Sequence, residues 1–257
     1  MAIPISLGLY TVYDDLCRDM PNTLRRVAAM GYDGVEFYGE FAWPAEDVRR
    51  ALDDTGLALT GWHTEWRLLQ PDTLDATTAY LRAVGCPVAI VPCLGGQWHV
   101  AHGPGEECRA VWQGHIAHMN ELAGWLGPHG IALGYHNHEH EFQLHYDGQT
   151  VYDLLYGQLS KAVVMELDTG NAIEGGGDPA AVLRQYHDRP TLLHCKPWSV
   201  ERGFDVRLGE PGDRNDWPAI LAACGPVCRA LVVENEARGD GFANAAACLA
   251  ALRKYRR

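Results

Sequence analysis

The sequence IALGYHNHEHEF, residues 131–142, combines two kinds of chemistry in one short stretch. Its first five residues form an apolar run of the kind that a buried strand requires. Three histidines and two glutamates then follow within seven residues. Such a cluster is unusual in a packed core, because burial removes the hydration of imidazole and carboxylate groups. The stretch therefore predicts a strand whose C-terminal end carries a metal site or an acid–base site. The alternative is a solvated loop that happens to contain several histidines.

The same pattern of a short apolar strand followed by a helix repeats on both sides of this stretch. Strands are expected at residues 5–10, 34–38, 57–62, 88–92, 131–135, 163–167, 191–193 and 231–233. Helices are expected at residues 21–30, 44–55, 74–84, 106–126, 151–159, 178–186, 217–224 and 242–254. Apolar strands separated by helices indicate a parallel sheet that helices cover. Eight units in 257 residues predict a single (β/α)8 TIM barrel over residues 1–257, with an open doubly wound sheet as the alternative.

Composition excludes several classes of function. The chain is 47% hydrophobic and carries a net charge of −12, so basic surface for nucleic acid or anionic membranes is not expected. No apolar run is long enough to span a membrane. The eight cysteines include no C-x2-C pair, and no secretory signal is visible at the first residues. We therefore expect reduced thiols in a cytoplasmic protein, and a homo-oligomer remains open.

The predicted strands end in residues that can do chemistry. In a TIM barrel the active site lies at the C-terminal ends of the strands. Those ends carry Tyr10, Glu36, His63, Cys93, the cluster at residues 136–141, Asp168, His194, Lys196 and Glu234. Chance would place mostly apolar residues there. A site built from two Glu, one Asp and one His offers mainly oxygen ligands, which suit Mn2+ first and Mg2+, Co2+, Fe2+ or Zn2+ as alternatives.

Four motifs in barrel order make the sequence resemble a known family. They are Tyr135-His136-Asn137-His138-x-x-Glu141-Phe142, residues 166–171 with Gly177-Asp178-Pro179, His194-Cys195-Lys196, and Val233-Glu234. Residues 8–12 and 31–37 add a similar opening. With these motifs the chain resembles the xylose-isomerase-like barrels, the sugar (phosphate) isomerase/epimerase superfamily. Within that superfamily it is similar to the branch close to inosose dehydratases.

The resemblance implies a divalent metal held by residues from the fifth to the eighth strand: Glu141, Asp168, His194 and Glu234. The fifth-strand ligand has an alternative. In many relatives the glutamate lies on the strand itself, where this chain has His136 or His138. His136 and His138 would share one face of a regular strand, so Glu141 needs the following loop to bring it inward. His138 is the alternative ligand or a nearby acid–base group.

The resemblance also implies roles in proton transfer and in substrate binding. Glu141, Glu234 and His138 are the candidates for moving the proton. The candidates for substrate binding are His63, His136, Lys196, Glu36 and Trp198. A hydrogen-bonded structural histidine is the alternative for His63, and an ordinary lysine at the barrel mouth is the alternative for Lys196. Pro197 and Trp198 stand where many relatives have an aspartate after the His-x-Lys motif.

The predicted function is a metal-dependent isomerase or epimerase that acts on a sugar, a cyclitol or a keto derivative. Its chemistry is proton abstraction next to a carbonyl through a metal-stabilised enediolate. The first alternative is a lyase that dehydrates an inosose or cleaves a 3-keto-glycoside, possibly as a subunit of a glycoside-cleaving complex. The second alternative is an endonuclease-IV-like nuclease, against which the charge of −12 counts.

Overall fold

The computed structural model describes residues 3–256 and contains a closed barrel of eight parallel strands. The barrel strands are β1 (Ile5–Gly8), β2 (Gly34–Tyr38), β3 (Ala58–His63), β4 (Val88–Val91), β5 (Ala132–His136), β8 (Val164–Asp168), β9 (Thr191–Cys195) and β10 (Cys228–Val233). Neighbours in sequence are neighbours in space, and β10 pairs with β1 to close the ring. The predicted TIM barrel is thus confirmed.

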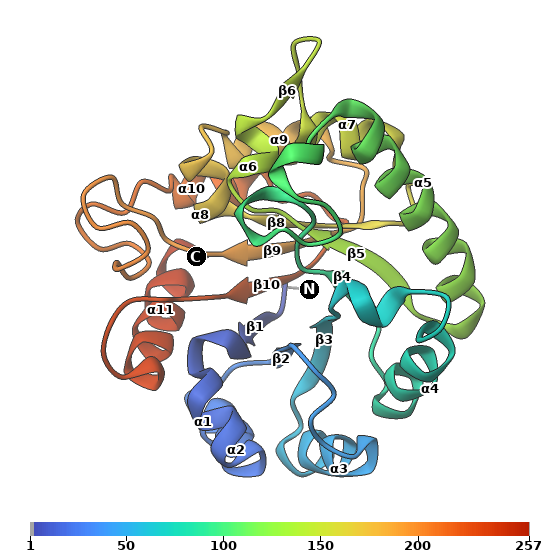
Figure 1. The fold of residues 1–257 in the computed structure, drawn as a ribbon. Helices are drawn as coiled ribbons and strands as arrows, with labels where there is room; N and C mark the ends of the chain where they lie inside the picture. The colour runs from blue at the N-terminus through green and yellow to red at the C-terminus, as the bar shows by residue number, and fades with distance from the viewer. Residues whose placement is uncertain (1–2, 257) are drawn as a thin grey trace.

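Helices surround the strands on the outside (Figure 1). They are α1 (Tyr13–Arg18), α2 (Met20–Met30), α3 (Ala45–Thr55), α4 (Leu74–Val84), α5 (Arg109–Leu126), α6 (His140–Gln143), α7 (Val151–Gln158), α8 (Thr169–Glu174), α9 (Pro179–Gln185), α10 (Trp217–Ala223) and α11 (Gly241–Tyr255). Short 3-10 helices are η1 (Leu9–Val12), η2 (Trp66–Leu69), η3 (Gly96–Trp98), η4 (Pro104–Glu106) and η5 (Gly127–His129). The eight expected helices correspond to α2, α3, α4, α5, α7, α9, α10 and α11.

The additional α-helices, α1, α6 and α8, lie in the connections that follow β1, β5 and β8. A hairpin of β6 (His145–Tyr146) and β7 (Gln149–Thr150) joins α6 to α7. Its two-residue turn, Asp147 and Gly148, has positive φ at both positions (54° and 79°). That backbone suits the twist of a tight hairpin, and Asp-Gly is a preferred sequence for it.

The inside of the barrel is apolar at one level and polar at the next. A separate cluster of buried apolar side chains fills the interior: Val88, Ile90, Val164, Leu192, Ala230 and Val232. Residues two apart on a strand share a face. The next inward positions are therefore Glu166 after Val164, His194 after Leu192, and Glu234 after Val232. The apolar layer thus forms a floor beneath a layer of ionisable groups.

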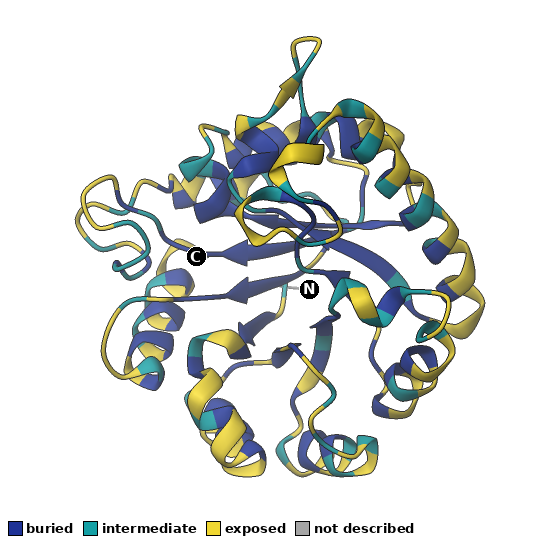
Figure 2. Cartoon of the chain, in the orientation of Figure 1, coloured by how far each residue is buried: buried dark blue, intermediate teal, exposed yellow. Residues whose placement is uncertain are grey.

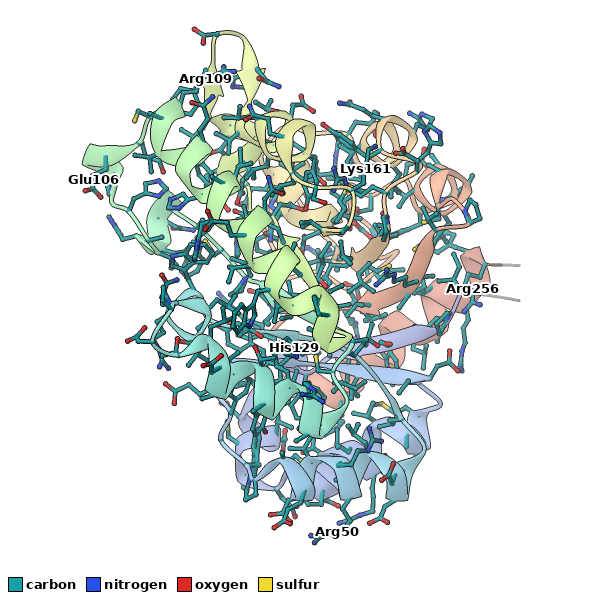
Figure 3. All side chains as sticks on the ribbon, turned by 90° about the vertical axis from the view of Figure 1, so that its right-hand side faces the viewer. Arg50, Glu106, Arg109, His129, Lys161 and Arg256 are labelled. Atoms are coloured by element: carbon teal, nitrogen blue, oxygen red, sulfur yellow. The ribbon has the colours of Figure 1, made fainter. Side chains whose placement is uncertain are left out.

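The second, larger core lies between the strands and the helices, and charged side chains lie outside it. Figure 2 shows the barrel strands as almost continuously buried, whereas the outer helices alternate between buried and exposed residues. The side chains of Arg50, Glu106 and Arg109 lie at the margin of the molecule in Figure 3. All eight cysteines, each within residues 3–256, are free thiols. No helix in that range is both long and apolar enough to cross a membrane.

Candidate active site

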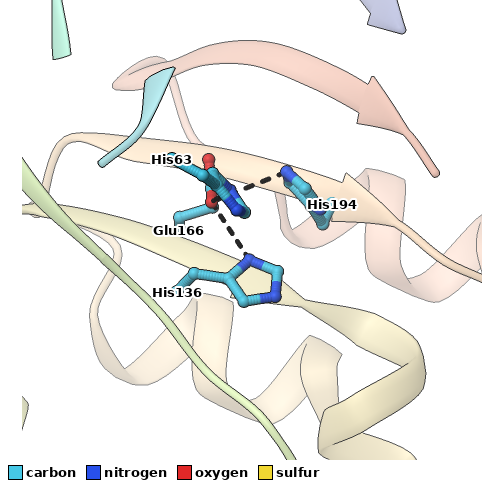
Figure 4. A group of neighbouring side chains, drawn as sticks. All are labelled: His63, His136, Glu166 and His194. Carbon is cyan, nitrogen blue, oxygen red and sulfur yellow. Dashed lines mark hydrogen bonds and ion pairs between the residues drawn. The ribbon is translucent and has the colours of Figure 1, made fainter. Parts of the chain in front are cut away.

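Glu166 lies at the centre of a buried group of histidines on the inward face of the barrel (Figure 4). His63, at the end of β3, lies with Nε2 2.6 Å from Glu166 Oε2. His136, at the end of β5, lies with Nδ1 3.0 Å from the same oxygen. An ionised carboxylate only accepts hydrogen bonds, so both rings donate an N–H to Glu166. This carboxylate therefore orients two imidazoles that come from different strands.

Glu36 orients a third histidine in the same way. His194 Nε2 lies 2.7 Å from Glu36 Oε1, which joins β9 to β2 across the interior. The N–H on Nε2 donates to that carboxylate, so in the neutral ring it is Nδ1 that carries the free lone pair. Metal-ligating histidines characteristically direct their other ring nitrogen toward a carboxylate in this manner.

The free nitrogen of His194 points toward two further carboxylates. Its Nδ1 lies 3.8 Å from Asp168 Oδ2 and 3.5 Å from Glu234 Oε2. His136 contributes from another side, with Nε2 3.9 Å from Asp168 Oδ2. Asp168 Oδ2 and His194 Nδ1 are buried and have no hydrogen-bond partner among residues 3–256. Asp168, His194 and Glu234 thus place one ligand atom each within 4.8 Å of one another, as a divalent ion requires.

The electrostatics of this group favour an additional positive charge. Burial raises the pKa of Asp168 to about 7, and Glu234 acts in the same direction. Burial also raises the pKa of Glu166 to about 7, with a contribution from Glu36. Burial alone would lower the pKa of His194, but the Glu166 and Glu36 carboxylates raise it to about 9. A cation among these carboxylates would stabilise their ionised forms and take the place of the proton on His194.

Lys196 lies beside this group, two residues beyond His194 and directly after the end of β9. Its Nζ is 3.0 Å from Glu234 Oε1 and 2.5 Å from Glu236 Oε1. The ammonium group also lies 4.4 Å from the centre of the Phe204 ring. Burial opposes the charge of Lys196, but Glu234 and Asp168 raise its pKa well above the ordinary lysine value. Lys196 is therefore a buried cation that holds one side of Glu234.

The structure places Glu141 apart from the other predicted metal ligands. Glu141 lies on α6, beyond the end of β5, and is fully buried. Its carboxylate accepts hydrogen bonds from the Tyr135 hydroxyl and from the His138 backbone N–H, the latter at 2.9 Å. The chain turns into α6 after His136, so the glutamate points into the wall between strand and helix. Of the predicted set, the geometry brings together Asp168, His194 and Glu234.

The remaining predicted residues divide between the cavity and its surroundings. A cavity of about 1000 Å3 opens above the group, and its walls include His63, His136, His138, Lys196 and Glu234. His138 is partly exposed there, and its Nδ1 has no hydrogen-bond partner among the described residues. Glu36 lies below, bound to His194. Trp198 follows β9 but is absent from the described lining of the cavity.

Glu166 and Glu236 are site residues that the sequence reasoning did not select. Glu166 stands in the run VVMELD, and it shares an inward face with Asp168 because the two are separated by one residue. A glutamate inside a fully buried strand is rare without a partner, which is a signal that could have identified it. Glu236 follows Glu234 by two residues in the loop after β10, and only its contact with Lys196 reveals its role.

Comparisons with known proteins agree with this architecture. Residues 24–254 match the family described as the xylose isomerase-like TIM barrel. One curated relative, an inosose dehydratase of Geobacillus kaustophilus (strain HTA426), is 26% identical over 196 residues. The alignment covers 67% of this chain and 60% of that relative, so the chain spans less than two thirds of the relative's length.

Solved structures show the same fold over the whole chain. A sugar phosphate isomerase/epimerase from Parabacteroides distasonis ATCC 8503 superposes with a TM-score of 0.80 at 22% identity, covering 100% of this chain and 96% of that one. An L-ribulose 3-epimerase superposes with a TM-score of 0.70 at 18% identity, with the same two coverages. At such identities the likeness concerns the fold.

Proposed function

The chain belongs to the xylose isomerase-like TIM barrel family, and from that premise we propose that it is a divalent-metal-dependent isomerase or epimerase. The proposed substrate is a sugar, a cyclitol or a keto derivative of either. One observation carries the proposal: Asp168 Oδ2 and His194 Nδ1 are buried without hydrogen-bond partners, and both face Glu234. Buried polar atoms are rarely left unpaired, and a cation would pair both of these at once.

We propose that Asp168, His194 and Glu234 hold the ion, with His136 Nε2 as the fourth ligand. Mn2+ is the first expectation, because the set mixes carboxylate oxygens with imidazole nitrogens. When bound, a divalent ion supplies a Lewis acid that polarises a carbonyl oxygen. Glu166 and Glu36 keep the two imidazoles in the required orientation, as their hydrogen bonds to His136 and His194 support.

In this proposal His138 and the pair of Glu234 with Lys196 move the proton. Burial lowers the pKa of His138 well below the ordinary histidine value, and the Lys196 charge acts in the same direction. The imidazole is therefore neutral at physiological pH and can accept a proton from carbon next to a carbonyl. Glu234 follows β10, three positions around the barrel from β5. Burial opposes its charge, but the Lys196 ammonium lowers the pKa of Glu234, so this carboxylate is ionised and the proton returned from this side comes from the Lys196 ammonium that it holds. Glu141 positions His138 by accepting its backbone N–H.

A second candidate reaction is dehydration, which the inosose dehydratase relative favours. It begins with the same proton abstraction next to a carbonyl. The two outcomes then differ in whether the proton returns to carbon or a hydroxyl group leaves the neighbouring carbon. Lys196 and His63 line the cavity and are the proposed contacts for substrate hydroxyl groups.

Metal content tests the site. Elemental analysis of protein purified without chelator should find about one divalent ion per chain. Asp168→Asn and His194→Ala should each lose the ion, because each removes an inward ligand atom. Asp188→Asn is the matched control, since Asp188 is exposed and pairs with Lys161 on the surface. Full metal content in both site variants would overturn the assignment.

Proton exchange tests the reaction. Ketoses, inososes and 3-keto-glycosides would be incubated with the enzyme in D2O and followed by NMR. Deuterium at the carbon next to the carbonyl, with the carbon skeleton and hydroxyl groups retained, is the result expected for an isomerase or epimerase. An unsaturated or rearranged product that lacks one hydroxyl group would identify the dehydratase instead. A substrate that the wild type exchanges and His138→Ala does not would support the role of His138.

A further inference from the structure

Three tyrosines form an exposed aromatic surface beside the mouth of the cavity. Tyr10 lies in η1 after β1, Tyr13 begins α1, and Tyr38 ends β2. They are 42%, 37% and 37% exposed. The Tyr10 and Tyr13 rings lie 5.0 and 5.8 Å from the Tyr38 ring, centre to centre. We call these three residues the tyrosine platform; clustered exposed aromatic rings commonly mark a binding surface.

The platform is continuous with the site described above. Tyr10 and Tyr38 both line the cavity, together with Lys196 and Glu234. The Tyr38 ring centre lies 6.0 Å from that of His63, which contacts Glu166. A molecule whose reacting part lies above the strand ends can therefore extend onto the platform without leaving the cavity.

The cavity is larger than one sugar ring requires. Its volume of about 1000 Å3 is at the upper end of the roughly 300–1,000 Å3 that pockets for drug-sized ligands occupy. A hexose is considerably smaller than such a ligand. The volume therefore leaves space for a second ring beside the one that reacts.

The charges on the walls favour an uncharged ligand. Apart from histidines, the cations of the described lining are Arg67 and Lys196. Arg67 Nε pairs with Glu65 at 2.7 Å, and Lys196 pairs with Glu234 and Glu236. Both cations are therefore already neutralised by neighbouring carboxylates. Away from the proposed metal site, a phosphate group on the second part of a ligand would meet acidic walls without a free cationic side chain to bind it, which disfavours phosphorylated ligands.

From the cavity, the paired cations and the platform together, we infer that the protein binds an uncharged two-ring glycoside. The reacting sugar lies above the strand ends, and the second ring packs against Tyr10 and Tyr38. The planes of these two rings are inclined at 64°, so the ligand ring stacks on one of them and meets the edge of the other. A flat aromatic ring and the apolar face of a second sugar ring have this stacking chemistry in common. The inference rests on the proposed carbohydrate site and specifies which substrates that site accepts.

Calorimetric titration of the protein purified without chelator tests this subsite. The probes are methyl and phenyl glycosides of glucose, galactose and mannose in both anomers, cellobiose against glucose, and glucose 6-phosphate. Each phenyl glycoside is compared with the matching methyl glycoside, and cellobiose with glucose. In at least one of these pairs the two-ring member should bind about tenfold more tightly, as expected for stacking on an aromatic surface. The phenyl pairs and cellobiose distinguish an aromatic second ring from a sugar ring. Glucose 6-phosphate should bind no more tightly than glucose.

Variants show where the second ring lies. Tyr10→Ala and Tyr38→Ala should each reduce the two-ring preference severalfold. Tyr255→Ala, a similarly exposed tyrosine at the end of α11, should retain it. The inference is overturned if no two-ring probe is preferred, if the preference survives both platform variants, or if the phosphate is preferred. Proton exchange in D2O is scored separately: exchange without a two-ring preference refutes only the subsite, and a platform-dependent preference without exchange refutes only the proposed reaction.

Discussion

His136 and His194 each use one ring nitrogen for a carboxylate and turn the other toward Asp168. His136 gives Nδ1 to Glu166, and His194 gives Nε2 to Glu36. The free nitrogens then lie 3.9 and 3.8 Å from Asp168 Oδ2. This arrangement makes the two rings equivalent in relation to Asp168. For this reason we propose His136 as the metal ligand from the fifth strand, a role for which the sequence suggested Glu141 or His138.

Two variants decide between His136 and Glu141. His136→Ala should weaken Mn2+ binding by about 100-fold or more, since loss of an outer partner alone costs about 10–100-fold. Glu141→Gln should keep the metal affinity, because this carboxylate points at Tyr135 and at the His138 backbone. Titration against a competing metal indicator measures both affinities. The opposite pattern, with metal lost in Glu141→Gln and kept in His136→Ala, would make Glu141 the ligand.

At the scale of elements, residues 94–108 lie in the connection from β4 to α5 beside the cavity, and a network of hydrogen bonds and ion pairs that includes His115 of α5 holds this connection in place. Two non-glycine residues in it, His99 and Ala101, have positive φ of 52° and 67°. A positive φ is unfavourable for a residue with a side chain, and it persists where contacts with the surrounding structure hold the backbone in that conformation. His102 Nδ1 is hydrogen-bonded to His115 Nε2 at 2.8 Å, and His102 Nε2 lies 2.9 Å from Glu107 Oε1. The network fixes a connection whose Trp98 lines the cavity.

This network predicts a loss of stability in acid. Burial lowers the pKa of His115 to about 4, and His102 and His118 act in the same direction against Glu107. Between about pH 6.5 and pH 4 the unfolded chain binds a proton at His115 that the folded chain does not. The free energy of unfolding should therefore fall as the pH falls through this window, and His115→Gln should reduce that fall.

Urea unfolding followed by circular dichroism between pH 4.5 and 7.5 measures this effect. His129→Gln is the matched control, because His129 is an exposed histidine in η5. The free energy of unfolding should depend on pH with the same slope in the wild type and in the control. In His115→Gln this slope should be smaller by up to the contribution of one bound proton. Equal slopes in all three proteins would contradict the prediction.

At the scale of the whole molecule, the proposed ligands tie together one side of the barrel. Asp168, His194 and Glu234 come from β8, from β9 and from the end of β10, and His136 comes from β5. These strands are consecutive neighbours in the ring. Unfolding separates them and destroys the site, so an ion that binds only the folded chain stabilises the whole barrel.

Thermal unfolding measures this coupling. Mn2+ at about 100 times its Kd should stabilise the folded chain by about 2.7 kcal/mol. For a chain of this size that corresponds to a rise in Tm of roughly 5–10 °C. EDTA should reverse the rise, and Asp168→Asn should abolish it. A Tm that is the same with Mn2+ and with EDTA would exclude an ion that links these strands.

The barrel could be predicted from the sequence because its determinants are local. Runs such as residues 88–91 are apolar throughout, and helices such as α2 end at a glycine with positive φ, here Gly31. Residues at strand ends, among them Asp168 and His194, could be selected as chemical because imidazole and carboxylate groups are costly in a core without a partner.

The partners of these groups were decided only by the tertiary structure. Glu36 meets His194 across 158 positions of sequence, and His63 meets Glu166 across 103. Glu141 stands five residues after His136, yet the turn into α6 directs it away from Asp168. The sequence by itself determined the barrel and the chemical character of its strand ends, because strand alternation and burial are properties of neighbouring residues. Which nitrogen faces which carboxylate depends on closure of the ring, since only closure brings the ends of distant strands together.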